Sequence, residues 1–218
     1  MQGYKNALKD REEAAKKLID MMPMQKLKEE KWHIVAVSKG GLKLAQYLKG
    51  RLKNPLEILF LEAITAPHNS ECEIARVSET EEIVLNEKLI DSFEIQYDYI
   101  YGEAHRKHEE DILSHIYQYR KGRPFPSMED KVVLLVDEGS ETGTKFMTAL
   151  KTVLNQKPKA VYIAVPVLPK DVLEVLETFV DEIFFLYEID DYVETALYYT
   201  RLDEIEDDEI EKILEENR

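Results

Sequence analysis

Two adjacent acids, Asp137 and Glu138, directly follow a run of five apolar residues in this chain of 218 residues. The run, residues 132–136, is long enough for a strand buried on both faces and too short for a buried helix. Carboxylates at the carboxyl end of a strand can accept hydrogen bonds from the two hydroxyls of a sugar diol. Because acids have little structural use at such a position, we expect this pair to bind a ligand.

A loop of small and hydroxyl-bearing residues follows the acids and leads into a helix. Its members are Gly139, Ser140, Glu141, Thr142, Gly143 and Thr144. Glycines let the backbone approach an anion, and the free N–H groups and positive end of a helix attract one. The stretch therefore predicts a phosphate site, with an ordinary strand–loop–helix junction as the alternative.

A second junction of the same kind lies nearer the N-terminus. Between an expected strand at residues 32–37 and a helix that continues from residue 42 stand Ser38, Lys39, Gly40 and Gly41. A lysine beside paired glycines suits a phosphate or a diphosphate, although Gly-Gly between a strand and a helix is common. The two junctions together supply a separate loop for each end of a phosphorylated sugar diphosphate.

Spacing excludes the two most familiar nucleotide loops. A Walker A loop places four residues between its glycines and then continues Gly-Lys-Ser/Thr, whereas Gly139 and Gly143 enclose three residues. The dinucleotide pattern Gly-x-Gly-x-x-Gly is absent from the whole sequence.

The elements that would position these loops alternate between strand and helix. Strands of a main sheet are expected at residues 32–37, 56–63, 132–136, 160–165 (closed by Pro166) and 182–187, with helices at 10–22, after each loop, and at 171–179. Residues 64–71 are expected to form a polar loop, 74–78 and 82–85 a hairpin, and 87–93 and 94–119 two helices. This order predicts an α/β protein with a parallel sheet and ligands at the strands' carboxyl ends.

Composition fits one globular α/β domain over residues 1–218, with 44% hydrophobic and 33% charged residues. Its core would be about 32–187, and a small hood would combine the N-terminal helix, an insert at about 64–125 and the C-terminal segment. The net charge of -15 argues against nucleic acid or an anionic membrane as the main partner. The charge is uneven, since Lys and Arg outnumber Asp and Glu within residues 1–54.

A single cysteine, Cys72, rules out an internal disulfide and fits a reducing cytosol. We find no signal peptide and no apolar run of membrane-spanning length, so we expect a cytoplasmic protein.

Other residues that could do chemistry have simpler explanations. His105, His108 and His115 lack the His-x-x-x-His spacing of helical metal ligands, which favours a solvated helix face. The aromatic patch of Tyr192, Tyr198 and Tyr199 suits packing better than base stacking. The acidic stretch 202–218 suits a solvated terminal helix better than a protein-interaction element.

With these motifs in place, the chain resembles the stand-alone predicted phosphoribosyltransferases of bacteria, which have the type I phosphoribosyltransferase fold. The family's motif for phosphoribosyl diphosphate (PRPP) has four apolar residues, two acids and a short run that ends Thr-Gly-x-Thr or Thr-Gly-Thr, as residues 133–144 do. The resemblance implies that Asp137 and Glu138 hold the ribose hydroxyls. It also implies that Ser140 to Thr144 cradle the 5′-phosphate and Ser38 to Gly41 the diphosphate.

The resemblance further implies transfer of a phosphoribosyl group from PRPP to a nitrogen acceptor, a nucleobase, whose identity the sequence does not reveal. Asp137, Glu138 and Lys39 would be the catalytic residues, with Lys39 neutralising the departing diphosphate. Mg²⁺ would be bound mainly through PRPP, without direct protein ligands. A homodimer is the oligomeric state that we consider as an alternative to a monomer.

The chain departs from the family pattern at several positions, and two of the departures, Glu141 and the weakened basic loop at Lys39, favour an alternative, a PRPP or nucleotide sensor without catalysis. Glu138 stands where a second Asp is usual, and Lys39 replaces an Arg, so that a bidentate fork becomes a point charge. Glu141 stands where a small residue is usual. Its carboxylate would repel a phosphate unless it points away or Lys145 offsets it.

Overall fold

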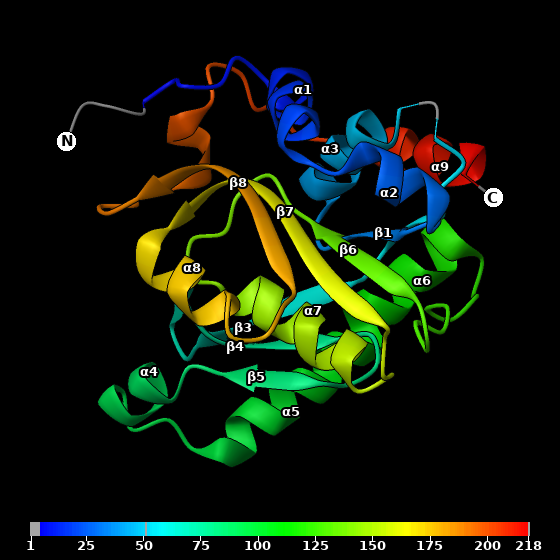
Figure 1. Ribbon diagram of the computed structural model, residues 1–218. Coiled ribbons are helices and arrows are strands. Elements are labelled where there is room, and N and C mark those ends of the chain that lie inside the picture. Colours follow the sequence, from blue (N-terminus) through cyan, green and yellow to red (C-terminus); the bar gives the residue numbers. More distant parts are fainter. Residues whose placement is uncertain (1–4, 51, 218) are drawn as a thin grey trace.

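The computed structural model describes residues 5–50 and 52–217, so the predicted unit 1–218 includes residues 1–4, 51 and 218 that lie outside the description. Five parallel strands form the main sheet in the order β2-β1-β6-β7-β8 (Figure 1). They are β1 (His33–Ala36), β2 (Leu56–Ile58), β6 (Val132–Val136), β7 (Ala160–Pro169) and β8 (Glu182–Ile189). The predicted parallel α/β fold is confirmed.

Strand β6 lies at the centre of the sheet because all five of its side chains are apolar and buried. Alternate residues enter different cores, as the period of two in a strand requires. Leu134 packs with the helices of one face, and Leu135 with those of the other. The strand therefore delivers Asp137 to the middle of the sheet's carboxyl edge.

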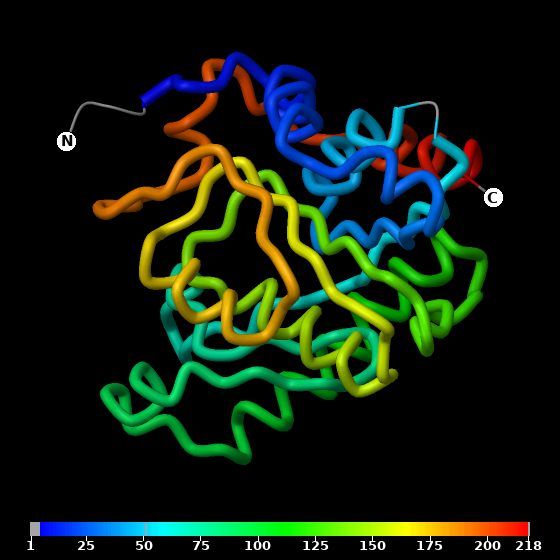
Figure 2. The backbone as a smooth tube through the Cα atoms, viewed as in Figure 1, coloured from blue at the N-terminus to red at the C-terminus, as the bar shows by residue number. Residues whose placement is uncertain are grey.

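Helices cover both faces of this sheet (Figures 1 and 2). One face carries α1 (Arg11–Met21), α2 (Met24–Glu29), α3 (Lys39–Lys49) and α9 (Asp207–Glu216), and the other carries α7 (Thr144–Leu154) and α8 (Lys170–Leu176). Asp10 caps α1, since its side chain accepts a hydrogen bond from the Glu13 amide.

A second, antiparallel sheet packs against α7 and lies largely within the insert expected at about 64–125; we call this sheet, with the helices that pack on it, the hood. The sheet contains β3 (Leu61–Ala66), β4 (Asn69–Ser78) and β5 (Ile83–Leu85) in that order. Behind it lie α4 (Glu87–Ser92), α5 (Tyr97–Lys107), a π-helical turn (His108–Ile112) and α6 (Leu113–Arg120) (Figure 1). The hairpin predicted at 74–78 and 82–85 is confirmed.

Three expectations about where elements begin and end were wrong. The expected strand 56–63 divides, because Leu59 makes the last backbone bond to β1 and Phe60 turns to bond Glu79 in the hood. The expected loop 64–71 is instead the β3–β4 hairpin. Strand β7 also continues through Pro166. At this point β7 has passed the end of β6 and has a neighbour only in β8, so it tolerates the missing N–H of a proline as an edge strand does.

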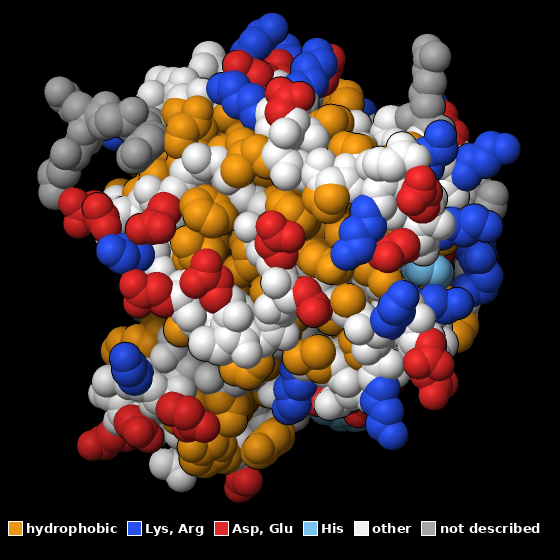
Figure 3. Space-filling view, viewed as in Figure 1, with side chains coloured by type: hydrophobic (Ala, Val, Ile, Leu, Met, Phe, Trp, Pro, Cys, Tyr) orange, Lys and Arg blue, Asp and Glu red, His pale blue; other side chains and the backbone are white. Residues whose placement is uncertain are grey.

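Charge is unevenly distributed on the face seen in Figure 3. Lys and Arg gather over α1 and over the end of the molecule that holds α2, whereas Asp and Glu gather near α4 and α8. Among residues 5–50 and 52–217, every helix is too short or too polar to cross a membrane.

A buried ion pair joins the hood to the end of α6. Arg120 Nη2 contacts Glu79 Oε2, and both side chains are only 2% exposed. The guanidinium also lies over the Phe60 ring, 5.0 Å from its centroid. Burial raises the pKa of Glu79 and Arg120 opposes that rise, so the carboxylate depends on its cation.

We predict that Arg120→Met lowers the free energy of unfolding by about 3–5 kcal/mol, because it leaves a buried carboxylate without a cation. Adding Glu79→Gln should restore part of the loss, since no buried charge then remains. Urea denaturation measures both variants. Arg106→Met, which breaks the exposed pairs with Glu103 and Glu110, is the control and should cost less than about 1 kcal/mol. Equal losses for Arg120→Met and Arg106→Met would contradict the prediction.

Candidate functional site

The Asp137 carboxylate is fully buried, and both of its oxygens are engaged. Its Oδ1 accepts hydrogen bonds from Ser38 Oγ at 2.5 Å and from the Glu138 amide at 2.9 Å. Its Oδ2 lies 2.5 Å from Nζ of Lys145, in the first turn of α7. The expectation that the acids have little structural use is therefore wrong for Asp137, which ties β6 to two helices.

Glu138 is paired with a cation from the other end of the chain. Its Oε2 lies 2.5 Å from Arg11 Nε, while Arg11 Nη1 donates to the Asp203 carbonyl at 2.8 Å. The Glu138 carbonyl accepts a hydrogen bond from Tyr199 Oη at 2.7 Å. Burial and then the Asp137 charge raise the pKa of Glu138, and Arg11 opposes that rise.

The structure places the two predicted phosphate junctions beside each other, at neighbouring strand ends. Ser38 caps α3 by accepting a hydrogen bond from the Gly41 amide at 2.9 Å. Gly40 and Gly41 thus belong to the first turn of the helix and not to a loop before it. A Cβ on Gly41 would lie 2.6 Å from the Val136 carbonyl oxygen, so glycine allows α3 to approach the end of β6 this closely.

Lys39 is directed away from the acidic pair. Its Nζ lies 2.8 Å from Asp207 Oδ1 at the start of α9, and 5.6 Å from the centroid of the Tyr119 ring. Residues of the same junction therefore face in two directions, with Ser38 toward Asp137 and Lys39 toward the C-terminal helix.

The loop after the acids presents unused backbone donors. Within the described part of the chain, no hydrogen bond is made by the amides of Gly139, Ser140, Glu141, Thr142 or Gly143. Gly143 has φ +74°, in the region that favours glycine, and Thr144 begins α7. Free amides before a helix start are suited to an anion.

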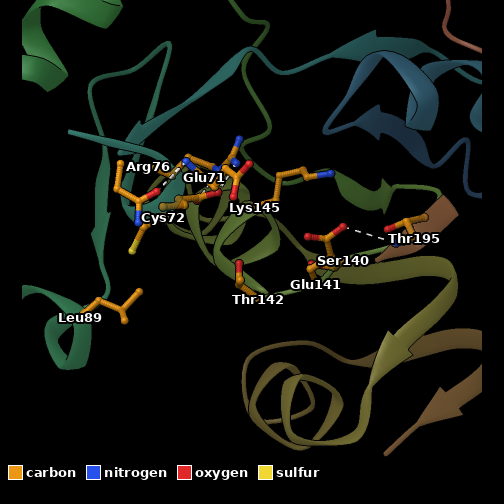
Figure 4. Close-up of a pocket in the computed structure, with 12 residues that line it drawn as sticks. Glu71, Cys72, Arg76, Leu89, Ser140, Glu141, Thr142, Lys145 and Thr195 are labelled. Carbon is orange, nitrogen blue, oxygen red and sulfur yellow. Dashed lines mark hydrogen bonds and ion pairs between the residues drawn. The ribbon is translucent and has the colours of Figure 1, made fainter. Parts of the chain in front are cut away.

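A cavity of about 540 Å³ opens between this loop and the hood (Figure 4). Its lining comprises Asn69, Glu71, Cys72, Glu73, Arg76, Leu89, Gly139, Ser140, Glu141, Thr142, Lys145 and Thr195. The other predicted site residues are not on this lining; they are Ser38, Lys39, Gly40, Gly41, Asp137, Glu138, Gly143 and Thr144. The hood wall carries an ion pair in which Arg76 donates to both oxygens of Glu73.

Glu141 lies on the cavity wall and bonds across it rather than to Lys145. Its Oε1 accepts a hydrogen bond from the Thr195 amide at 3.3 Å, as Figure 4 shows. Lys145 is paired with Asp137. The alternative in which Lys145 neutralises the charge of Glu141 is therefore not the arrangement in the structure.

Sequence reasoning missed Arg11, Arg76 and Thr195 as site residues. Arg76 stands in a predicted strand and Thr195 in a C-terminal stretch without a motif. Arg11 stands in the helix expected at residues 10–22, and 127 residues separate it from Glu138. No local signal in the sequence marks such a pairing.

We predict that Arg11→Met destabilises the fold increasingly as the pH rises. The folded-state pKa of Glu138 lies above its ordinary value of 4.5, so ionising Glu138 costs stability above about that pH. Removing Arg11 raises the pKa further and increases the cost, to on the order of 2 kcal/mol at neutral pH. Unfolding measured from about pH 4 to pH 8 tests this, with the exposed Arg201→Met as the control. A loss independent of pH would sink the prediction.

No family model matches the chain. The curated protein "Putative phosphoribosyl transferase Rv0571c" of Mycobacterium tuberculosis (strain H37Rv) is 21% identical over 182 residues, which are 84% of this chain and 41% of that protein. The corresponding protein of strain CDC 1551 matches equally well. The chain thus spans about two fifths of the length of these relatives.

Among solved structures, the crystal structure of TT1426 from Thermus thermophilus has a TM-score of 0.76 and 28% identity, and the match covers 96% of this chain and 98% of that one. A purine phosphoribosyltransferase from Pyrococcus horikoshii Ot3 gives a TM-score of 0.41 at 18% identity, over 83% of this chain and 93% of that one. We infer nothing from so distant a likeness. The chain combines a parallel sheet covered by helices with a small antiparallel sheet, and its sequence is similar to that of curated putative phosphoribosyl transferases, so it resembles the type I phosphoribosyltransferases.

Proposed function

We propose that this protein binds PRPP with Mg²⁺ and transfers the phosphoribosyl group to a nitrogen acceptor, a nucleobase. One observation carries the proposal. A strand end with two acids, a loop of free amides and a cavity of about 540 Å³ adjoin one another at the sheet's carboxyl edge. Open parallel sheets bind their ligands at that edge.

The proposal assigns different parts of the ligand to different groups. The 5′-phosphate takes the amides of residues 139–143, and the ribose lies against the acids. Both carboxylate oxygens of Asp137 already have partners in the protein, whereas Glu138 Oε1 has no hydrogen-bond partner among the described residues. We therefore assign the ribose hydroxyl to Glu138, with Asp137 holding Ser38 and Lys145 in position.

In this proposal Mg²⁺ arrives on the substrate. In the ranges 5–50 and 52–217, no cluster of three or more His, Cys, Asp or Glu side chains is placed to hold a metal ion. Mg²⁺ prefers oxygen ligands and keeps several waters, so PRPP oxygens and water suffice to hold it. When bound, it supplies positive charge to the diphosphate.

The reaction then breaks the bond between the anomeric carbon and the diphosphate oxygen, and the acceptor nitrogen forms a bond to the same carbon. The transition state resembles an oxocarbenium ion, so the protein contributes positioning and charge stabilisation. Lys39 has to leave Asp207 before it can neutralise the departing diphosphate.

The second candidate, a PRPP or nucleotide sensor, is favoured by two observations. Lys39 is tied to Asp207, and Glu141 adds a carboxylate to the cavity wall. Both features oppose binding and departure of a diphosphate without preventing ligand binding to the amides.

We predict that PRPP binds in isothermal titration with Mg²⁺, and that Glu138→Gln weakens binding at least about tenfold by removing a charged acceptor for the ribose, since charge-assisted bonds are worth about 1.5–3 kcal/mol. Glu177→Gln, at an exposed position directly after α8, is the matched control and should bind as the wild type does. Turnover across a panel of nucleobases favours the enzyme, and binding without turnover favours the sensor. Absence of binding refutes both.

We also predict that Glu141→Gln tightens PRPP binding, because a carboxylate a few ångströms from the 5′-phosphate costs on the order of 1 kcal/mol. Glutamine keeps the acceptor for the Thr195 amide. The gain should shrink as salt is raised, which titrations at two ionic strengths measure. Weaker binding by the variant would instead show that Glu141 contacts the ligand or its metal, and would refute the phosphate-cradle assignment.

A further inference from the structure

The C-terminal helix α9 lies along α3 and bonds to three of its lysines. Lys39 Nζ is 2.8 Å from Asp207 Oδ1, and Lys43 Nζ is 2.6 Å from Glu209 Oε1. Lys49 Nζ contacts Asn217 Oδ1 at the far end. Between these contacts α9 buries Ile210, Ile213 and Leu214 in the core that it shares with α3 and α6 (Figure 1). The helix therefore docks firmly beside the Ser38–Gly41 junction.

Asp207 is held in position independently of Lys39. Its Oδ1 accepts a hydrogen bond from Tyr119 Oη at 2.6 Å, and its Oδ2 accepts one from Gln118 Nε2 at 3.3 Å. Both donors belong to α6, and α9 itself is anchored by its buried face. When Lys39 moves away, the Asp207 carboxylate stays where it is.

Lys39 itself is attached loosely. Its side chain is 45% exposed and that of Asp207 is 56% exposed, so water competes for both ends of the pair. A lysine stem is flexible and its ammonium can turn to another anion. The residue also heads α3 directly after Ser38, whose hydroxyl contacts Asp137. A diphosphate at this junction would meet a cation that already has a partner.

We propose that α9 acts as a strap on the diphosphate end of the site, in which Asp207 competes with the ligand for Lys39 and thereby sets the affinity. This inference rests on the proposed function, because it assumes that a diphosphate binds at the Ser38–Gly41 junction. It assigns to the acidic C-terminal helix a role in tuning the site.

The size of the effect follows from the exposure of the pair. Exposed ion pairs are worth up to roughly a factor of five in an equilibrium constant. Removing the Asp207 charge should therefore release Lys39 and tighten inorganic diphosphate about threefold to fivefold. Inorganic phosphate should gain less, since it can occupy the amides of residues 139–143 without Lys39.

The test is titration of inorganic diphosphate, with Mg²⁺, into the full chain and into Asp207→Asn. The control is Asp208→Asn, which changes the same charge one residue further on, where the Asp208 carboxylate bonds the Glu209 amide instead of Lys39. We expect the threefold to fivefold gain for Asp207→Asn and less than about a twofold change for the control. In a Lys39→Ala background the gain from Asp207→Asn should disappear.

Labelling of Lys39 with an amine-reactive reagent, read by mass spectrometry, tests the strap without any ligand. Asp207→Asn should raise labelling of Lys39 severalfold and leave that of Lys43 unchanged. Diphosphate binding that is equal in the wild type and Asp207→Asn, or a gain that survives Lys39→Ala, overturns the strap alone. Raised labelling with no diphosphate binding in any variant overturns the proposed function, and the strap's role in affinity with it.

Discussion

The ion pair between Asp137 and Lys145 is the interaction on which the arrangement of the site depends. A fully buried carboxylate is costly unless it is paired and its remaining lone pairs are satisfied. Here the pairing comes from α7 through Lys145 and from α3 through Ser38. Because both groups stand in or before a first helical turn, satisfying one buried charge brings the starts of two helices to the same strand end.

Glu138 extends this constraint to both ends of the described chain. Arg11 from α1 neutralises it, and the same guanidinium holds the carbonyl of Asp203. Tyr199 bonds its backbone oxygen. Segments far apart in the sequence are thus fastened to two consecutive residues, so changes in these acids act on folding and, under the proposed function, on ligand binding as well.

The parts of this fold that could be predicted from sequence are those determined by residues close together in the chain. Five apolar residues in a row predict a central strand, and glycines with hydroxyl residues predict the junctions where α3 and α7 begin. The division of the expected strand 56–63 could not be predicted, because it depends on the distant Glu79 bonding the Phe60 amide. The sequence shows that Lys145 is a cation near the loop. It does not show that Lys145 pairs with Asp137 and not with Glu141, because that pairing follows from the burial of Asp137.

These pairings also determine what can attract an anionic ligand to a chain with a net charge of -15. Lys39, Arg11 and Lys145 each already contact a carboxylate of the protein. A phosphate that pairs with one of them replaces that carboxylate, so the net binding free energy is only the difference between the two ion pairs. The amides of residues 139–143 have no competing acceptor in the described part of the chain. Backbone donors before the start of α7 therefore attract an anion without competition from a protein carboxylate, whereas under the proposed function the side-chain cations add affinity only by exchanging one partner for another.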